Sequence, residues 1–544
     1  MSEHDESGGE GGGVLVRDLA LPLGEPPSAL RALAAQKLGW RAADVGDVRV
    51  RKTSVDARGD RPLKVYTVEV FRAGEDVPPE LPRELAPPKG MRPARAGEMP
   101  IIIGTGPAGL WAALRFMELG VPSLVLERGA GLSGRNDAIR ALRRHGELDP
   151  ESNLCFGIGG AGTYSDGKLY TRKRDPLIRK VYEDLVALGA PAEILVEAHP
   201  HVGTNRLIKM LGRLEAVLTD AGTEIRYGAK AAGLLRDGAG RVAGVRLADG
   251  TELTGPAVVL AAGHSARDVY RWLHADGVRL ARKPFAIGAR CEHPQELIDR
   301  IQYRRHAGHP ELEPAEYFLT AKVGERGVYS FCMCPGGFVI PTSTELGHLN
   351  VNGMSNHRRG SRFANAAIVA TVEPGDFWVE RPGDLDHEGP LAGLAFQRHL
   401  EAAAFAAGGG GYRAPAQRLT DFLAGKAGDL PESTSYRPGI AAADLRGVLP
   451  ERVHGAIARA LQAFERRMSG YVTKEAILIG VETTTSSPIR VERDEATLMA
   501  PGFPGLFPTG EGAGYAGGIV SSAIDGIKVA DAVVGAGIVA GLLR

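Results

Sequence analysis

The stretch Met99–Gly129, MPIIIGTGPAGLWAALRFMELGVPSLVLERG, decides the fold that this sequence predicts. Ile101–Ile103 is a short apolar strand, Leu110–Leu119 has helical spacing, and Ser123–Leu126 returns as a second strand. A strand, a glycine-rich turn, a helix and a strand in this order are typical of the mononucleotide-binding βαβ unit. The sequence therefore predicts an α/β protein with a Rossmann-like dinucleotide-binding domain.

Each residue type in the turn has a physical role. Gly104 permits the tight turn, Gly106 lets the backbone approach a pyrophosphate, and Gly109 allows the helix to pack closely on the strand. Pro107 suits the first helical turn, where its missing N–H costs nothing. Glu127, at the end of the second strand, is placed to accept hydrogen bonds from a ribose diol. The free amides and the helix dipole are then expected to face the phosphates.

Length and composition limit the remaining possibilities. A chain of 544 residues exceeds one typical core, so two or three domains are expected. Lys+Arg and Asp+Glu both number 65, which gives no general argument for nucleic acid or an anionic membrane as partner. Four cysteines make no disulfide framework and show no paired metal-ligand spacing. A reducing, cytoplasmic setting is expected, with no metal.

The two ends of the chain carry no predicted anchor. Residues 1–13, MSEHDESGGEGGG, lack the basic and apolar regions of a signal peptide and are expected to be a disordered tail. The apolar run Val529–Leu543 is too short to span a bilayer. We expect a buried C-terminal helix there and no membrane span.

A small α+β domain is predicted over residues 14–75, before a proline-rich linker over 76–98. Its basic face, around Arg49, Arg51, Lys52 and Arg58, is either a solvated sheet face or a docking site. The expected order is β-α-β-β, with elements at Val14–Leu19, Ser28–Leu38, Val48–Ser54 and Lys64–Phe71.

The dinucleotide-binding domain is predicted in two parts, over 99–281 and 482–544, around an inserted α+β substrate domain over 282–481. In the first part, Ala257–Ala262 is a continuous apolar run typical of a buried parallel strand. In the insert, antiparallel strands are expected at Phe285–Cys291, Glu316–Val323, Val328–Met333 and Phe338–Pro341, and helices at Leu391–Phe405 and Glu451–Met468. In the last part, the strand Leu506–Pro508, the turn Thr509–Gly518 and the helix Ile519–Val534 return to the nucleotide domain.

Two further glycine-rich segments match G-x-G-x-x-G without repeating the first motif. Asn153–Tyr170 follows no strand and leads into no helix, so it is interpreted as a loop that approaches a cofactor or, alternatively, as a plain surface loop. Its polar groups are Thr163, Ser165, Asp166 and Lys168. Thr509–Gly518 lies between a strand and a helix, so its helix N-terminus is expected to face an electron-rich group.

Together these segments resemble two-domain flavoproteins of the glutathione-reductase type and, more closely, the bacterial family of uncharacterised FAD-dependent dehydrogenases. The motifs that carry the resemblance span almost the whole chain: RKTSVDARGD (Arg51–Asp60), GGAGTYSDGKL (Gly159–Leu169), AAGHSARD (Ala261–Asp268), PFAIGARCEHPQELID (Pro284–Asp299), SFCMCPGG (Ser330–Gly337), NGMS (Asn352–Ser355), ETTTSSP (Glu482–Pro488) and GEGAGYAGGI (Gly510–Ile519). The resemblance implies FAD as cofactor. The predicted cofactor contacts are Gly104, Gly106, Pro107, Ala108, Gly109, Glu127, Arg128, Gly160, Gly162, Thr163, Ser165, Asp166, Gly263, Gly510, Glu511 and Gly514.

Two residues are candidates for the chemistry. His264, at the end of a strand, could take the proton that accompanies hydride removal, or it could satisfy backbone around the flavin. Lys168 could place positive charge near flavin N1, or bind a phosphate. Cys332 and Cys334, in C-x-C, are expected to be structural, because one intervening strand residue is poor geometry for a disulfide.

The function predicted is that of an FAD-dependent oxidoreductase, with hydride passing between flavin N5 and a small organic substrate or reduced nicotinamide, NAD(P)H. One alternative is a flavoprotein that modifies or docks on a macromolecule through its N-terminal domain. Another is an isoprenoid or lipid reductase. The substrate and the oligomeric state stay open.

Overall fold

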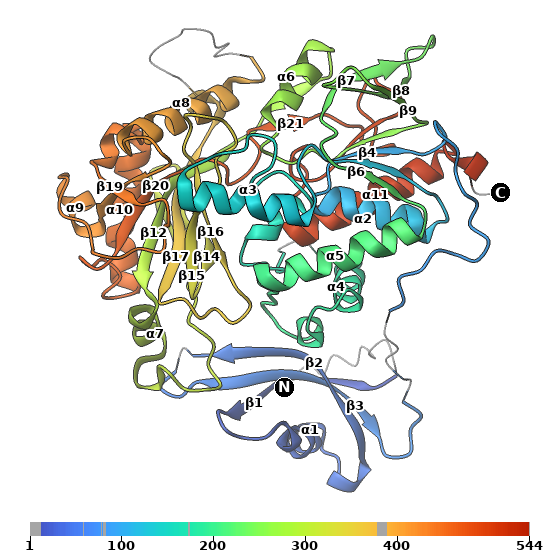
Figure 1. The fold of residues 1–544 in the computed structure, drawn as a ribbon. Helices are drawn as coiled ribbons and strands as arrows, with labels where there is room; N and C mark the ends of the chain where they lie inside the picture. The colour runs from blue at the N-terminus through green and yellow to red at the C-terminus, as the bar shows by residue number, and fades with distance from the viewer. Residues whose placement is uncertain are drawn as a thin grey trace.

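The computed structural model describes residues 12–57, 59–77, 79, 83–171, 174–377 and 389–542 (Figure 1). The expected tail lies outside these residues up to position 11, and so do Arg58 and Leu543. Three bodies of structure follow one another along the chain, with the C-terminal residues returning to the second.

The N-terminal body is a three-stranded antiparallel sheet with one helix. Its elements are β1 (Val14–Pro22), α1 (Leu30–Leu38), β2 (Val45–Asp56) and β3 (Leu63–Arg72), in the sheet order β1-β3-β2. Gly39 ends α1 in the left-handed conformation, as expected of a helix stop. The apolar side chains of helix and sheet close a core of their own, so the elements of the predicted β-α-β-β unit are present.

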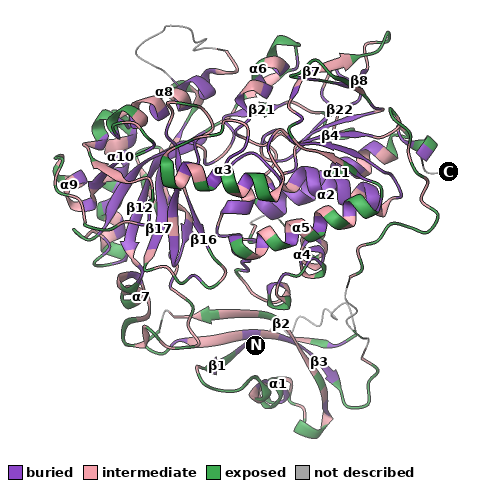
Figure 2. Cartoon of the chain, in the orientation of Figure 1, coloured by how far each residue is buried: buried purple, intermediate pink, exposed green. Residues whose placement is uncertain are grey.

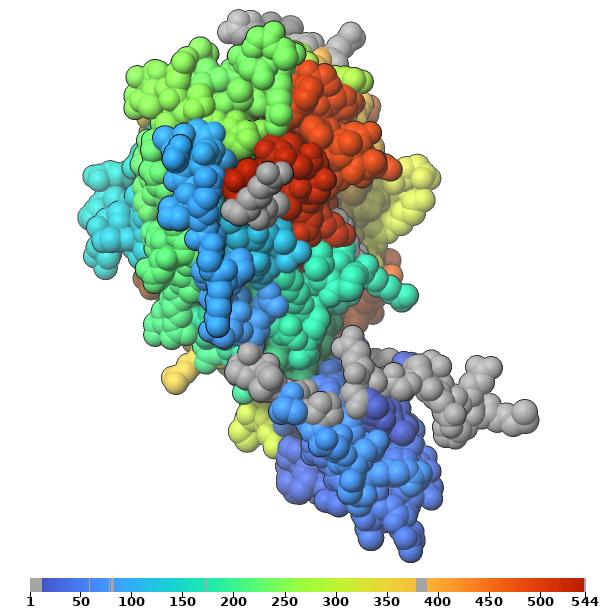
Figure 3. All heavy atoms as spheres, turned by 90° about the vertical axis from the view of Figure 1, so that its right-hand side faces the viewer, coloured from blue at the N-terminus to red at the C-terminus, as the bar shows by residue number. Residues whose placement is uncertain are grey.

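This N-terminal body meets the rest of the chain through backbone as well as side chains. The Thr53 amide donates to the Val196 carbonyl at 2.6 Å, and the Ala198 amide donates to the Thr53 carbonyl at 2.9 Å. Arg304 pairs with Asp60 at 3.2 Å. In the space-filling view the body forms a lobe at the lower end of the molecule (Figure 3).

A five-stranded parallel sheet carries the nucleotide motif. Its order is β22-β10-β4-β5-β6, and every neighbouring pair is parallel. The strands are β4 (Ile101–Ile103), β5 (Leu124–Leu126), β6 (Glu224–Arg226), β10 (Val258–Leu260) and β22 (Leu506–Pro508). The segment Leu506–Pro508 returns to this sheet, as the sequence predicts, and pairs with the strand at Val258–Leu260.

Two helices pack against each other on one face of this sheet (Figure 1). They are α2 (Pro107–Glu118) and α11 (Ile519–Gly535). A side chain at Gly526 would collide with the Ala108 carbonyl, so this glycine permits the close crossing. The prediction of a helix over Val529–Leu543 is wrong beyond Gly535, because a glycine-containing turn separates α11 from a short 3₁₀ turn at Ala540–Leu542.

The remaining elements of this body surround the sheet. The helices are α3 (Leu132–His145), α4 (Leu177–Ala187), α5 (Thr204–Asp220) and α6 (Arg267–Ala275). The strands β7 (Ala231–Arg236), β8 (Val242–Leu247) and β9 (Glu252–Thr254) form the expected antiparallel meander.

A mostly antiparallel seven-stranded sheet makes up the third body, in the order β13-β14-β17-β12-β20-β18-β19. Its strands are β12 (Phe285–Pro294), β13 (Thr320–Val323), β14 (Arg326–Cys334), β17 (Phe363–Val372), β18 (Ala414–Arg418), β19 (Ile440–Ala442) and β20 (Ile477–Glu482). The strand predicted over Glu316–Val323 begins only at Thr320, because Glu316 and its neighbours run as irregular chain beside Lys168.

Four helices and a hairpin cover this sheet. The helices are α7 (Gln295–Tyr303), α8 (Ala392–Ala407), α9 (Leu419–Ala424) and α10 (Glu451–Arg467), and the hairpin is β15 (Gly337–Pro341) with β16 (Val351–Ser355). A short pair, β11 (Leu280–Arg282) with β21 (Ile489–Val491), joins the two large bodies. Both large sheets are buried through most of their length, with the exposed faces of the helices outside (Figure 2).

Candidate cofactor site

The turn between β4 and α2 has the close backbone contacts that its glycines predict. A side chain at Gly104 would collide with the Ala261 carbonyl, and one at Gly109 would collide with the Gly104 carbonyl. Gly106 is different, because no atom lies within 4 Å of where its Cβ would stand. Pro107 occupies the first turn of α2, and no side chain caps this helix. The Cβ side of Gly106 is therefore open beside an uncapped helix N-terminus, an arrangement that suits a phosphate.

The loop Asn153–Tyr170 lies across this helix N-terminus. The Gly159 amide donates to the Thr105 carbonyl at 2.8 Å. A Cβ on Gly160 would stand 3.0 Å from the Cα of Gly106, and one on Gly162 would stand 3.6 Å from Pro107. The first and second glycine segments, which lie more than 40 residues apart in the sequence, thus meet at one point.

Arg135 on α3 holds this loop, and the sequence analysis did not identify it. Its guanidinium is fully buried and donates to five backbone carbonyls of the loop, those of Asn153, Leu154, Gly157, Ile158 and Gly160, and to the Thr163 hydroxyl. Burial lowers the pKa of Arg135. One signal was available: Arg135, Ile139 and Leu142 share the buried face of the helix at i, i+4 and i+7. A charged residue on an apolar helix face indicates a specific buried partner.

Glu127 joins three segments of the site. Its carboxylate accepts from the amide and hydroxyl of Thr105 at 3.0 and 2.5 Å, and from the Gly129 and Gly157 amides at 2.9 Å each. These four donors match the lone-pair sites of a carboxylate. A ribose hydroxyl would share these oxygens with the protein, so Glu127 as the ribose ligand stays a prediction.

The C-terminal glycine segment completes the convergence. A Cβ on Gly510 would stand 2.7 Å from that of Ala108, and a side chain on Gly512 would collide with the Gly263 carbonyl. Asp525 of α11 accepts from the Gly510 amide at 2.7 Å and fixes the turn. Gly514 has φ +86°, and Glu511 is half-buried beside it. The N-terminus of α11 at Gly518, like that of α2, has no side-chain cap.

Other predicted contacts make protein contacts of their own. Ser165 hydrogen-bonds within its own loop, to the Gly162 carbonyl and the Gly167 amide, and the Thr163 hydroxyl lies between Arg135 and the Ile158 carbonyl. Arg128 pairs with Glu151 and Asp268, and its guanidinium stacks on Phe156 at 4.2 Å.

Asp166 and Lys168 belong to a charged cluster, and their predicted roles at the cofactor stay predictions. Asp166 is fully buried and pairs with Arg359 at 2.9 Å, while Lys168 pairs with Glu316 at 2.7 Å and with Asp166 at 3.4 Å. Burial opposes the charge of Asp166, but Lys168 and Arg359 hold the pKa of its carboxyl below the ordinary value. His264 is half-buried at the end of β10, with its Nδ1 2.8 Å from the Ser265 hydroxyl.

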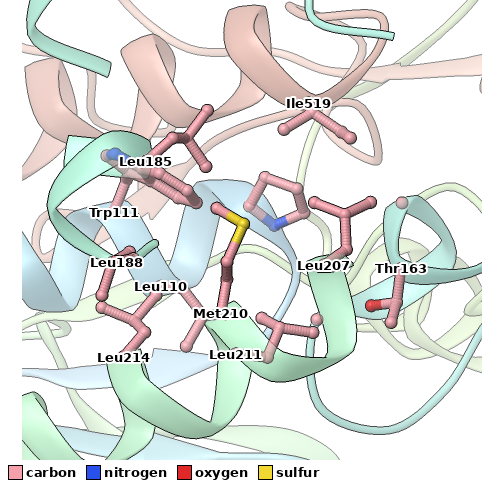
Figure 4. Close-up of a pocket in the computed structure, with 13 residues that line it drawn as sticks. Leu110, Trp111, Thr163, Leu185, Leu188, Leu207, Met210, Leu211, Leu214 and Ile519 are labelled. Carbon is pink, nitrogen blue, oxygen red and sulfur yellow. The ribbon is translucent and has the colours of Figure 1, made fainter. Parts of the chain in front are cut away.

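A small apolar cavity of about 40 Å³ opens behind the convergence point (Figure 4). Helices α2, α4 and α5 supply most of its walls, including Trp111, Leu185 and Met210. Pro107, Gly162 and Ile519 line it on the side of the glycine turns.

Among the described residues no group of histidines, cysteines and carboxylates could hold a metal ion, and no helix is long and apolar enough to cross a membrane.

Comparison with known proteins identifies the family. A family model described as "FAD-dependent protein, C-terminal domain-like" matches residues 284–485, and a domain of unknown function matches residues 15–71. An uncharacterised protein of Clostridium beijerinckii is 39% identical over 540 residues, which cover 96% of this chain and 98% of that protein. The chain belongs to this family of uncharacterised FAD-dependent proteins. The predicted cofactor, FAD, and the predicted family are thereby confirmed.

Solved structures are more distant. A geranylgeranyl bacteriochlorophyll reductase-like protein of Thermoplasma acidophilum is 13% identical, with a TM-score of 0.34 over 82% of this chain and 81% of that chain. The flavin-dependent brominase Bmp2 is 13% identical, with a TM-score of 0.36 over 81% of this chain and 79% of that chain. At such identities and scores neither activity transfers to this family.

The residues of the convergence point fit FAD. The open side of Gly106, the uncapped N-termini of α2 and α11 and the glycine-lined contact between the three segments suit a dianionic pyrophosphate and an extended ligand. The predicted contacts that the structure brings together are Gly104, Gly106, Pro107, Ala108, Gly109, Glu127, Gly160, Gly162, Gly263 and Gly510. The individual contacts stay predictions.

Proposed function

We propose that the protein is an FAD-dependent oxidoreductase that transfers hydride between flavin N5 and a small organic substrate or reduced nicotinamide. The convergence of three glycine segments on the N-termini of α2 and α11 carries this proposal. FAD, when bound, supplies a two-electron acceptor and donor, so the chain's own tasks are binding, orientation and proton handling.

Binding and orientation fall to different parts of the site. The first-turn amides of α2 would hold the pyrophosphate, and Gly160 and Gly162 would close over it. Arg135 keeps the closing loop in one conformation, so its order does not have to be created when the cofactor binds. Gly263 and Gly510, at the ends of adjacent parallel strands, would line the path toward the flavin end.

Proton handling is proposed for His264. Its Nδ1 contacts the Ser265 hydroxyl, which fixes the ring and leaves Nε2 as the atom to hold or release a substrate proton. Lys168 is paired with Asp166 and Glu316, and this neutralisation reduces its value as a free positive charge for the flavin. In this proposal Lys168 mainly anchors the loop that carries it.

The test is anaerobic reduction of the purified yellow protein. Stoichiometric FAD and its bleaching by NADH, NADPH or one member of a panel of small alcohols, amines and acids are expected, followed by reoxidation with a matching acceptor. Purification of a colourless protein, or bound FAD that no two-electron donor reduces, would overturn the proposal. His264→Gln is expected to bind FAD normally and to lose the alkaline or acid limb of the pH–rate profile.

A further inference from the structure

Four of the sequence motifs have no role in the cofactor site, and the structure brings them together in the third body. Arg290 comes from PFAIGARCEHPQELID on β12, Cys332 and Cys334 from SFCMCPGG on β14, Gly353 from NGMS on β16, and Glu482 from ETTTSSP at the end of β20. A side chain at Gly353 would collide with the Arg290 guanidinium. The glycine therefore makes room for the arginine at the centre of this group.

The two cysteines lie at an irregularity in β14. Phe331 pairs with Ala367 and Cys334 with Asn365, so β14 places one residue more than β17 between these pairs. Cys332 adopts a left-handed conformation, with φ +46°. The Cys334 thiol donates a hydrogen bond to the Cys332 carbonyl at 3.3 Å, so the two cysteines contact each other at the bulge. The strand is therefore not regular at the two cysteines, and that they are structural stays a prediction.

The buried guanidinium of Arg290 contacts both cysteines and Glu482. Its guanidinium donates to the carbonyls of Phe331 and Cys332 at 3.2 and 3.1 Å and lies 3.7 Å from Cys334 Sγ. Its Nε lies 3.3 Å from Glu482 Oε2.

Buried polar atoms in this group are incompletely hydrogen-bonded. Among the residues that the structure describes, Arg290 Nε and both carboxyl oxygens of Glu482 are buried without a hydrogen bond, although Nε and Oε2 form an ion pair at 3.3 Å. Both side chains are fully buried. Such atoms are costly to bury, and they cluster at reactive sites. This observation is independent of the cysteines and points to the same place.

The charges around the thiols favour one reactive sulfur. The hydrogen bond from Cys334 lowers the pKa of Cys332 to about 6. The positive charges of Arg290 and Lys168 act in the same direction, whereas burial and the charge of Asp166 act in the opposite one. The same hydrogen bond and burial raise the pKa of Cys334. Burial also raises the pKa of Glu482, to about 7, so this carboxyl adds less negative charge beside the thiolate than an ordinary glutamate. Cys332 is half-buried, whereas Cys334 is buried, so the thiolate is also the more reachable sulfur.

We propose that Cys332 and Cys334 form a redox-active thiol pair that reduces low-molecular-weight disulfides. The Cys332 thiolate attacks one sulfur of the disulfide, which forms a mixed disulfide and releases one thiolate. Cys334 then gives its proton to solvent, and its sulfur attacks the Cys332 sulfur, which releases the second thiolate. One external disulfide is reduced to two thiols while the two cysteines are oxidised to one disulfide, so the two electrons balance.

Titration of the full-length, FAD-loaded protein with the chromogenic disulfide dithionitrobenzoate tests the pair. The wild-type protein is expected to release two equivalents of coloured thiolate in its fast phase and to yield a peptide with Cys332 joined to Cys334 by mass spectrometry. Cys334→Ser is expected to release one equivalent and to keep a stable mixed disulfide on Cys332. One equivalent from the wild-type protein, or no linkage between positions 332 and 334, would overturn the proposal even if the serine variant failed to fold.

The chain supplies its own matched controls. Cys155 and Cys291 are buried thiols, and burial raises the pKa of Cys155 and raises that of Cys291 to about 12. Iodoacetamide is expected to modify Cys332 at least about tenfold faster than either of them at pH 7, with a rate that rises through a midpoint near pH 6. An equal rate for Cys332 and Cys291, or a midpoint near the ordinary value of about 8.5, contradicts the proposal.

Discussion

Replacing Arg135 by methionine tests whether one buried guanidinium builds the cofactor loop. The change removes every hydrogen bond from Arg135 to the loop and leaves five backbone carbonyls, four of them on buried residues, without this donor. Each buried polar group without a partner destabilises the fold by about 1–3 kcal/mol. Removal of the guanidinium also removes the cost of burying its charge, which offsets part of this destabilisation. We therefore expect the free energy of unfolding to fall by about 3–5 kcal/mol, with the loop Asn153–Tyr170 losing its order first.

The cofactor reports this loss directly. If about 3 kcal/mol of the loss falls on the cofactor-bound state, the Kd for FAD rises by about 100-fold. Visible absorbance after gel filtration measures retained FAD, and thermal unfolding with and without added FAD measures the stability. Arg135→Lys keeps the charge but has at most three donors, so an intermediate loss is expected.

Arg140 on the same helix is the matched control. Its side chain is 57% exposed and pairs with Asp137, so Arg140→Met is expected to change stability by no more than about 0.5 kcal/mol. Stoichiometric FAD in Arg135→Met, with a Tm equal to that of Arg140→Met, would refute the reasoning.

Three further changes probe other parts of the molecule. Gly106→Val fills the open side of the phosphate turn and is expected to abolish FAD retention while the apoprotein keeps its circular dichroism; retained stoichiometric FAD would contradict the assigned turn. Gly353→Ala pushes a methyl group into the Arg290 guanidinium and is expected to cost about 1–3 kcal/mol by denaturant titration, whereas Gly360→Ala, which meets no atom within 4 Å, should cost much less. Burial and the neighbouring carboxylates raise the pKa of Glu197 to about 7. The folded state therefore holds this proton more tightly than the unfolded chain, and the stability it contributes is present below about pH 4 and lost as the pH rises through about 7. The Tm of Glu197→Gln relative to wild type should rise between pH 4.5 and pH 8, and a pH-independent difference would count against the assignment.

The nucleotide-binding fold was predictable because its signals are local. The strand at Ile101–Ile103, the three glycines and the helix after them lie within about 20 residues, and each obeys the propensity of its own segment. The strands at Val258–Leu260 and Leu506–Pro508 were predictable for a similar reason, since a short continuous apolar run bounded by turns is typical of a buried parallel strand.

The rest of the site depends on contacts that no local pattern records. Asp166 was expected beside the cofactor, but its partner Arg359 lies 193 residues away and no spacing rule connects them. The C-x-C pair was expected to span one strand residue, and the bulge at this pair is visible only in the pairing of β14 with β17. The early end of α11 follows from the glycines after it, a signal that the apolar composition of the last residues concealed.

The late position of β22 and α11 in the sequence determines when the parallel sheet can be completed during synthesis. The parallel sheet has β22 at one edge, and α2 packs on α11, yet both elements lie in the last 40 residues. While the ribosome is still making the third body, β10 lacks its outer neighbour and α2 exposes the surface that α11 later covers. The candidate cofactor site can therefore form in full only after the segment Leu506–Gly535 has been synthesised.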